Sequence, residues 1–179
     1  GALCLLHNLQ SVGMCRIEAV VADACSDFIA PSVSVINDWF GRSGTPVGAL
    51  RLANYHTDPT FDSYRSATAR FQQRFPGRLF NRHLPAETIH EGKTAGDYPG
   101  TTEVYRRALA SAEDSSVVIC VVGFMTALRQ LLESPPDDVS PLSGAELLKQ
   151  KVRRVVAMAV VSPCPGRGDG NFNFRMDLP

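Results

Sequence analysis

Hydrophobic positions in the first fifty residues alternate between helical spacing and continuous apolar runs. Residues 2–12 place leucines on one helical face, and the run over 15–23 reads as a strand that ends near Asp23. A second helical pattern covers about 28–40 and is followed by a short apolar run over 45–50. This order of helix, strand, helix and strand predicts right-handed crossovers and a parallel sheet.

The middle of the chain changes character. Aromatic residues over 60–75 have helical spacing, and a Pro-Gly pair then stops the pattern. Residues 78–100 are polar and rich in glycine, which predicts a long surface excursion of the kind that often forms a lid or a site loop. A helical pattern resumes over 101–113.

The last third predicts two strand ends close to a ligand site. An apolar run over 117–122 stops at Gly123 and turns directly into a helical pattern over 124–133. After a proline-rich loop, a helix over 143–150 leads into a strand over 153–161. Such runs are typical of buried parallel strands, and ligands in open α/β sheets bind at the carboxyl ends of the strands. This places Thr126, Asn171 and Asn173 at the expected edge.

Composition predicts one globular α/β domain over residues 1–179. Lysine plus arginine and aspartate plus glutamate number 18 each, and the arginine pairs at 106–107 and 153–154 lie within predicted helices or strands. A nucleic-acid partner needs a connected basic face, so none is expected. The sequence has no apolar run long enough for a membrane span and no signal peptide, so no membrane partner is expected either.

The five cysteines are scattered and contain no C-x-x-C pair, which argues against a zinc site. Cys4 and Cys120 lie in apolar runs and are expected to be small buried hydrophobes. This usage favours a reducing, cytoplasmic compartment. The chain opens inside an apolar helical pattern without a capping residue and stops soon after a strand, so we interpret both ends as cuts in a longer protein.

Four segments carry a family resemblance. Residues 41–48 read G-R-x-x-x-P-V-G, and residues 104–128 contain a Val-Gly-x-x-Thr sequence. Residues 138–158 are similar to a lead-in to a Met-Gly-Gly strand, and 171–179 begin Asn-Phe-Asn-Phe and contain Asp177 and Pro179. In this order they resemble nucleoside hydrolases of the inosine–uridine type. The resemblance implies an open, mainly parallel, Rossmann-like sheet with helices on both faces, truncated at both ends.

The resemblance also implies a reaction, a metal and a set of site residues. The family hydrolyses the N-glycosidic bond of ribonucleosides with a calcium-activated water, and it is often oligomeric, which makes a homo-oligomer possible here. Thr126 matches the threonine whose carbonyl reaches the metal, whereas Met158, Asn171 and Asn173 match substrate-binding positions. The general-base aspartate and the main metal ligands of the family belong upstream of Gly1. We therefore expect no turnover from the isolated chain.

Other interpretations of the same residues stay open. Asn171 stands where the family has glutamate, Ala127 replaces an asparagine, and Ala159-Val160 replace two glycines. These departures favour the alternative of a non-catalytic α/β relative that binds ribose or a nucleoside without hydrolysing it. Taken alone, Thr126 is a residue at the start of a helix, Met158 is a core residue, and the two asparagines belong to a half-buried strand.

The remaining polar candidates have simpler readings. His83 and His90 are expected to be solvated, and His7 and His56 show no partner pattern. Asp23 and Asp27 could edge the pocket, although turn residues are the simpler reading. The Gly-Arg-Gly-Asp-Gly stretch at 166–170 lacks the following helix of a phosphate loop, and we interpret it as a surface turn.

Overall fold

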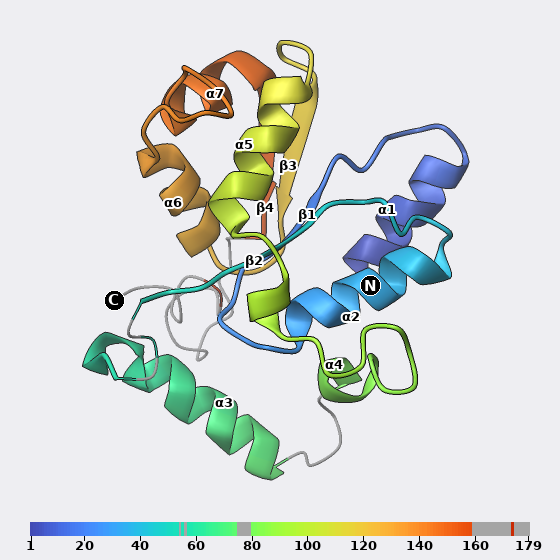
Figure 1. The fold of residues 1–179 in the computed structure, drawn as a ribbon, viewed down its shortest axis with the longest axis vertical. Coiled ribbons are helices and arrows are strands. Elements are labelled where there is room, and N and C mark those ends of the chain that lie inside the picture. Colours follow the sequence, from blue (N-terminus) through green and yellow to red (C-terminus); the bar gives the residue numbers. More distant parts are fainter. Residues whose placement is uncertain (54, 56, 75–79, 159–172, 174–179) are drawn as a thin grey trace, which may run out of the picture.

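Helices and strands alternate along the chain in nearly the predicted order (Figure 1). A computed structural model describes every residue except 54, 56, 75–79, 159–172 and 174–179. The helices are α1 (Ala2–Ser11), α2 (Ile29–Trp39), α3 (Asp62–Arg74), α4 (Phe80–His83), α5 (Thr101–Ser111), α6 (Thr126–Glu133) and α7 (Gly144–Lys151). The strands are β1 (Val20–Ala22), β2 (Val47–Ala49), β3 (Val117–Val121) and β4 (Val152–Ala157), and short 3-10 helices are η1 (Pro59–Phe61) and η2 (Ala95–Asp97).

The described strands pair in parallel, as the sequence predicts, but as two separate two-stranded sheets. Ala22 of β1 lies opposite Ala49 of β2, and Cys120 of β3 lies opposite Val156 of β4. The α/β class is therefore confirmed. The described strands do not form one continuous sheet. Residues 15–19, expected to extend β1, have irregular backbone, so β1 offers three residues for pairing.

Helix α5 packs against both sheets. At its first turn, Gly48 of β2 comes so close that a Cβ atom there would lie 3.1 Å from the Val104 Cβ. Farther along the helix, Leu109 joins a second core in which Leu131 of α6 and Leu147 of α7 are fully buried. The first core lies between β1, β2 and α2 and consists mainly of small side chains: Ala22, Ala30, Val47, Ala49 and Ala95.

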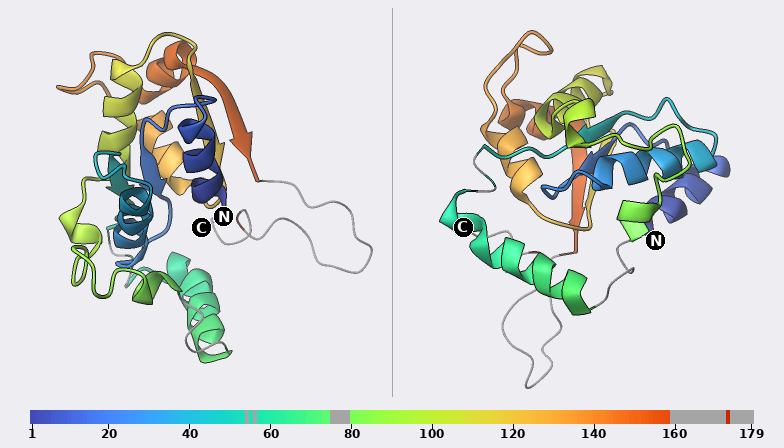
Figure 2. Two further views of the ribbon diagram at one scale, coloured as in Figure 1. Left: turned by 90° about the vertical axis from the view of Figure 1, so that its right-hand side faces the viewer. Right: turned by 60° about the horizontal axis from the view of Figure 1, so that its bottom comes forward.

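The β3–β4 sheet is largely exposed, which corrects the prediction of strands buried on both faces: one face of β3 is exposed, and so is every residue of β4 after Val152. Helices α5, α6 and α7 lie on the side of β3 where Ile119 and Val121 are buried (Figure 2), whereas the β4 partners of these residues, Val155 and Ala157, are exposed. On the opposite face, Val118, Val122 and Met158 are 48–54% exposed. Cys120 is also exposed there, so its apolar neighbours in sequence do not make it a buried residue. No described helix packs on the face that carries Val118 and Val122. The continuous apolar run in the sequence does not indicate this exposure.

The polar segment before α5 is folded against α2. The His90 Nε2 lies 2.7 Å from Asp38 Oδ2, and the His90 side chain is 10% exposed, so the expectation of a solvated histidine is wrong. The Tyr98 hydroxyl lies 3.4 Å from the other ring nitrogen. Desolvation alone would raise the pKa of Asp38, but hydrogen bonds from His90 and Ser43 and the charges of His90 and Lys93 together lower it. The excursion is thus anchored near its centre.

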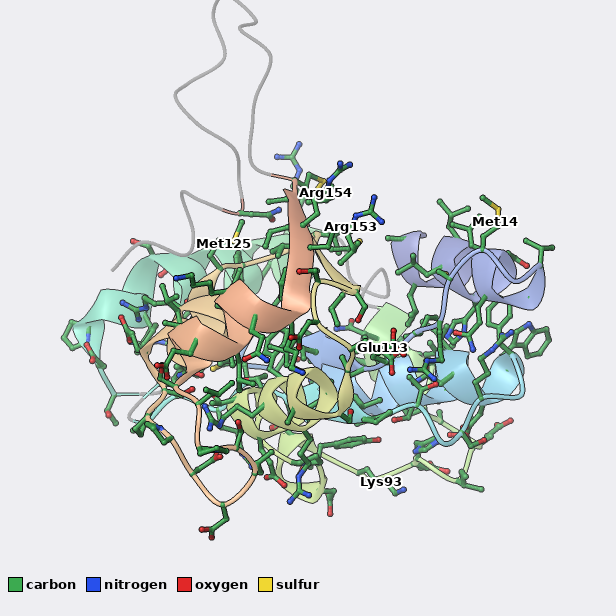
Figure 3. All side chains as sticks on the ribbon, turned by 90° about the horizontal axis from the view of Figure 1, so that it is seen from above. Met14, Lys93, Glu113, Met125, Arg153 and Arg154 are labelled. Carbon is green, nitrogen blue, oxygen red and sulfur yellow. The ribbon has the colours of Figure 1, made fainter. Side chains whose placement is uncertain are left out.

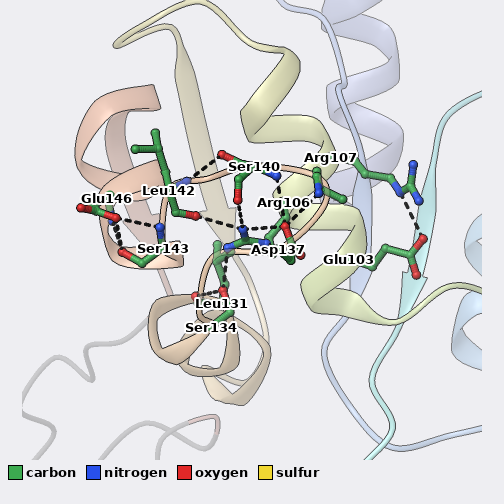
Figure 4. A network of polar contacts seen from close by, with 11 residues as sticks. Glu103, Arg106, Arg107, Leu131, Ser134, Asp137, Ser140, Leu142, Ser143 and Glu146 are labelled. Atoms are coloured by element: carbon green, nitrogen blue, oxygen red, sulfur yellow. Dashed lines mark hydrogen bonds and ion pairs between the residues drawn. The ribbon is translucent and has the colours of Figure 1, made fainter.

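The Arg106 side chain of α5 fixes the loop between α6 and α7 (Figure 4). Its guanidinium is 1% exposed and donates two hydrogen bonds of 2.7 Å to the Asp137 carboxylate. It also donates to Ser134 Oγ and to the carbonyls of Ser140 and Leu142. A planar guanidinium has five N–H groups in a fixed fork, so a single side chain can satisfy all these acceptors. The loop reaches Ser143, whose hydroxyl and Glu146 form the capping box of α7.

We predict that Arg106→Met lowers the free energy of unfolding by about 3 kcal/mol or more, because several acceptors lose their donor while methionine keeps the apolar volume. Urea unfolding followed by circular dichroism measures the change. The matched control is Arg107→Met, since Arg107 is exposed and pairs with Glu103 on the same helix. A change of less than about 0.5 kcal/mol is expected for the control. Equal losses in both variants would contradict the assigned role of Arg106.

The ion pair between Arg106 and Asp137 also makes the free energy of unfolding depend on pH. Hydrogen bonds from Arg106 hold the pKa of Asp137 below its ordinary value. The stabilisation is therefore fully present above the unfolded pKa of about 3.9 and is lost as the pH falls through the lower folded pKa. The difference in unfolding free energy between the wild type and Arg106→Met should shrink on acidification below about pH 4. A difference that stays constant from neutral pH to pH 2 would contradict this linkage.

Candidate functional site

The carboxyl ends of the two sheets meet at Asp23 and Gly123. Asp23 follows β1, and Gly123 lies just beyond β3. The Asp23 carboxylate packs directly on the Gly123 backbone, where a Cβ atom would lie 2.6 Å from Oδ1 and 2.7 Å from Cγ. A residue with a side chain at position 123 would therefore displace the carboxylate. In the sequence, the end of the apolar run at Gly123 marks the position where β3 stops.

Tyr105 of α5 contributes to the surroundings of Asp23. Burial raises the pKa of Tyr105 to about 12, and the charge of Asp23 adds to the effect. The phenol is consequently protonated at neutral pH. The Asp23 carboxylate thus lies between β1, β3 and α5, next to the start of α6. The sequence suggested that Asp23 could edge a pocket but favoured a turn residue, and its contact with Gly123 becomes visible only in three dimensions.

Thr126 is the first residue of α6, with Met125 at the N-cap position. In an α-helix, the N–H groups of the first turn point out of the N-terminal end, whereas the carbonyls point along the axis toward the C-terminus. The N-terminal end favours anions over cations. A metal contact from the Thr126 carbonyl would require that carbonyl to leave the helical direction. The contact stays a prediction.

Asn173 connects the ends of β3 and β4. Its side-chain amide donates to the Val122 carbonyl at 3.3 Å and to the Met158 carbonyl at 3.4 Å, and the residue is 8% exposed. The structure therefore brings the Asn173 side chain onto the Met158 backbone, and Asn173 is helical, so the expectation that it belongs to a half-buried strand is wrong. The Met158 side chain is 54% exposed, so it is not a core residue. Asn171 lies outside the described residues.

A cavity of about 180 Å³ opens at the carboxyl ends of β1 and β2. Cys25, Ser26 and Asp27 line it from the turn after β1, and Arg51 and Tyr55 line it from the segment after β2. Burial raises the pKa of the Cys25 thiol more than a hydrogen bond with the Leu52 backbone lowers it. A raised thiol pKa lowers the fraction of the nucleophilic thiolate at neutral pH.

The described residues do not fit a calcium ion. Among them, no three His, Cys, Asp or Glu side chains lie together in a way that could hold a metal. Calcium takes about six to eight oxygen ligands, and the carboxylate of Asp23 with one threonine supplies too few. We therefore derive no reaction step through a metal.

Two further observations concern the helices and the charged surface of the described residues. Within the described part of the chain, no helix is long and apolar enough to cross a bilayer. Arg153 and Arg154 project together from β4, whereas Lys93 lies on the opposite side of the same view (Figure 3). Arg106, the neighbour of Arg107, is buried.

Comparison of the chain with protein-family models, with curated proteins and with solved structures gives no match.

We predict that Gly123→Ala lowers the free energy of unfolding by about 1–3 kcal/mol, because the added methyl group collides with the Asp23 carboxylate. In an Asp23→Ala background the same change should cost less than half as much, since the colliding atoms are gone. Urea unfolding of the four proteins gives the coupling energy. A cost that is the same in both backgrounds would show that this contact does not set the need for glycine.

Proposed function

We propose that the protein containing this chain hydrolyses the N-glycosidic bond of ribonucleosides to free base and ribose. The observation that carries the proposal is the meeting of three strand ends, with Asp23 after β1, Gly123 after β3 and Asn173 against the carbonyls beyond β3 and β4. Ligands of doubly wound folds bind at such an edge. The proposal includes the finer fold assignment, a Rossmann-like sheet in which these two strand pairs are parts of one open sheet.

The chemistry assigns a role to each group. In the reaction, the oxygen of water bonds to C1′ of the ribose while the bond from C1′ to the base nitrogen breaks, and the proton of the water ends on the base. Positive charge develops on the sugar in an oxocarbenium-like state. A carboxylate such as Asp23 stabilises that charge, and the side-chain oxygen of Asn173 accepts from a ribose hydroxyl. Interactions that strengthen as the charge develops accelerate the reaction.

Met158 supplies the apolar part of this proposed wall. Its half-exposed side chain lies one residue beyond β4, and its carbonyl accepts from Asn173. A thioether chain is flexible enough to follow the sugar ring. Calcium dependence is kept as part of the proposal, with carboxylate ligands beyond those that the described residues supply.

A second candidate function is binding of ribose or a nucleoside without hydrolysis. Two observations favour it. The amide of Asn173 already donates to two backbone carbonyls, and no metal-holding group lies among the described side chains. A wall of this kind binds a sugar without activating a water.

A reducing-sugar assay on the full-length protein tests the first candidate. We expect ribose release from inosine and uridine, and loss of release when calcium is chelated. Asn173→Ala should lower kcat/KM about tenfold or more, because a hydroxyl contact is lost in the transition state. Arg107→Met on the exposed side of α5 serves as the unaffected control. For the isolated 179 residues we expect no turnover.

The outcomes separate the two candidates. Absence of ribose release under every condition, together with measurable nucleoside binding by calorimetry, would reject hydrolysis and support the binding function. Release that is indifferent to Asn173→Ala would reject the assigned wall.

A further inference from the structure

The polar segment between α4 and η2, residues 84–94, is attached to the rest of the fold with little apolar contact. It consists mainly of turns, and its buried residues are Pro85 and His90. Ile89, which precedes His90, is 78% exposed. We call residues 84–94 the strap. Segments with few buried apolar contacts open at a low cost in free energy, so the strap depends on its polar contacts.

The internal hydrogen bonds of the strap are local. The Thr88 N–H donates to the Pro85 carbonyl, and the Lys93 N–H donates to the His90 carbonyl. The Thr88 hydroxyl also donates to the Pro85 carbonyl. Bonds of this kind keep the shape of the strap but do not attach it to another element. The attachment to α2 comes from His90, whose Nε2 lies 2.7 Å from Asp38 Oδ2.

The contact between His90 and Asp38 has a defined direction. A carboxylate only accepts hydrogen bonds, so His90 Nε2 carries a proton and donates it. The other ring nitrogen, Nδ1, lies 3.4 Å from the Tyr98 hydroxyl and 3.5 Å from Lys93 Nζ. The bond from Nε2 therefore forms with a neutral or a protonated imidazole, provided that Asp38 is ionised.

Two left-handed backbone positions lie on either side of His90. Glu87 has a φ of 59° and Gly92 has a φ of 75°. Glycine adopts this conformation at little cost, whereas glutamate adopts it at a steric cost because of its Cβ atom. Opening of the strap relieves that cost. The buried contact of His90 thus holds the closed strap against local strain.

The strap leads directly into a wall of the cavity. Ala95, the first residue of η2, lines the cavity and is 7% exposed. The Arg51 guanidinium donates to the carbonyls of Ala95 at 3.3 Å and Gly96 at 3.4 Å. Thr94, the last residue of the strap, is also the N-cap of η2. Movement of the strap is therefore transmitted to this wall.

We propose that the strap is a latched conformational device, which opens as a unit when the contact between His90 and Asp38 breaks and then exposes the cavity from the side of Ala95. The remainder of the fold, including α5 and the cores on which it packs, stays closed. The device is independent of the proposed function, because it concerns access to the cavity and not what occurs there.

Acid releases the latch. Desolvation raises the pKa of Asp38, but hydrogen bonds and the charges of His90 and Lys93 together lower it. Burial raises the pKa of Tyr98, which also faces the latch, and the charges of Asp97 and Asp38 add to this effect, so Tyr98 stays protonated in acid. The stabilisation by the latch is fully present above the unfolded pKa of Asp38, about 3.9, and is lost as the pH falls through the lower folded pKa.

Hydrogen exchange of the full-length protein, followed by mass spectrometry, tests the latch. His90→Leu removes the donor and keeps an apolar volume. Peptides from the strap should then exchange about tenfold faster or more, as expected for the loss of a hydrogen bond to a charged group. Peptides from α5 should be unchanged. The matched control is Ile89→Ala at an exposed position of the same strap, which should change the exchange by no more than about twofold.

Two further measurements complete the test. Asp38→Asn keeps the size of the side chain and removes its charge, so it should accelerate exchange in the same direction, and it replaces His90→Leu if that variant does not fold. In the wild type, protection of the strap, corrected for the intrinsic exchange rate, should fall below about pH 4. In His90→Leu the protection should not change over this range.

Maleimide labelling of Cys25, located by peptide mapping, reports access to the cavity that this residue lines. At neutral pH it should be faster in His90→Leu by about the same factor as the exchange of the strap. Faster exchange and labelling with unchanged α5 peptides support the device. Equal acceleration in α5, or none in the strap, overturns it. Unchanged labelling of Cys25 in a variant with an open strap overturns the coupling to the cavity.

Discussion

The buried guanidinium of Arg106 is the interaction on which the second half of the fold depends. It joins α5 to Asp137, to Ser134 and to the carbonyls of Ser140 and Leu142. The loop held in this way sets where α6 ends and where α7 begins, and both helices close the core around Leu109. A buried charge is tolerated because every acceptor around it is oriented to receive an N–H group. The β3–β4 sheet, and with it one wall of the site, takes its position from this arrangement.

The site itself depends on close contact between the two sheets at their carboxyl ends. Asp23 reaches across to Gly123, and α5 holds the two halves together from one side through Gly48 and Leu109. Asn173 lies against carbonyls at the ends of β3 and β4, and the cavity with Tyr55 opens beyond β1 and β2.

Much of the element order could be predicted from the sequence, because each helix and strand leaves a local signal. The apolar residues of α2 have helical spacing, and β3 is a continuous apolar run that ends before Gly123. What could not be predicted are the contacts between distant segments. His90 was expected in solvent but bonds to Asp38, fifty-two positions away, and His7 stacks on Phe40 and bonds to Asn37. No local pattern announces such pairs, since they form only after α1, α2 and the polar excursion pack together.

The sequence by itself determined the α/β class, the parallel pairing of strands and the placement of Thr126 and Asn173 near strand ends, because hydrophobic periodicity and glycine stops are local properties of the chain. The tertiary structure alone decided that the described strands form two pairs, that one face of β3–β4 is exposed and that Asp23 packs on Gly123. It also decided the existence of the cavity between Asp27, Arg51 and Tyr55. These features depend on which surfaces meet, and the free energy of packing is shared among residues far apart in the chain.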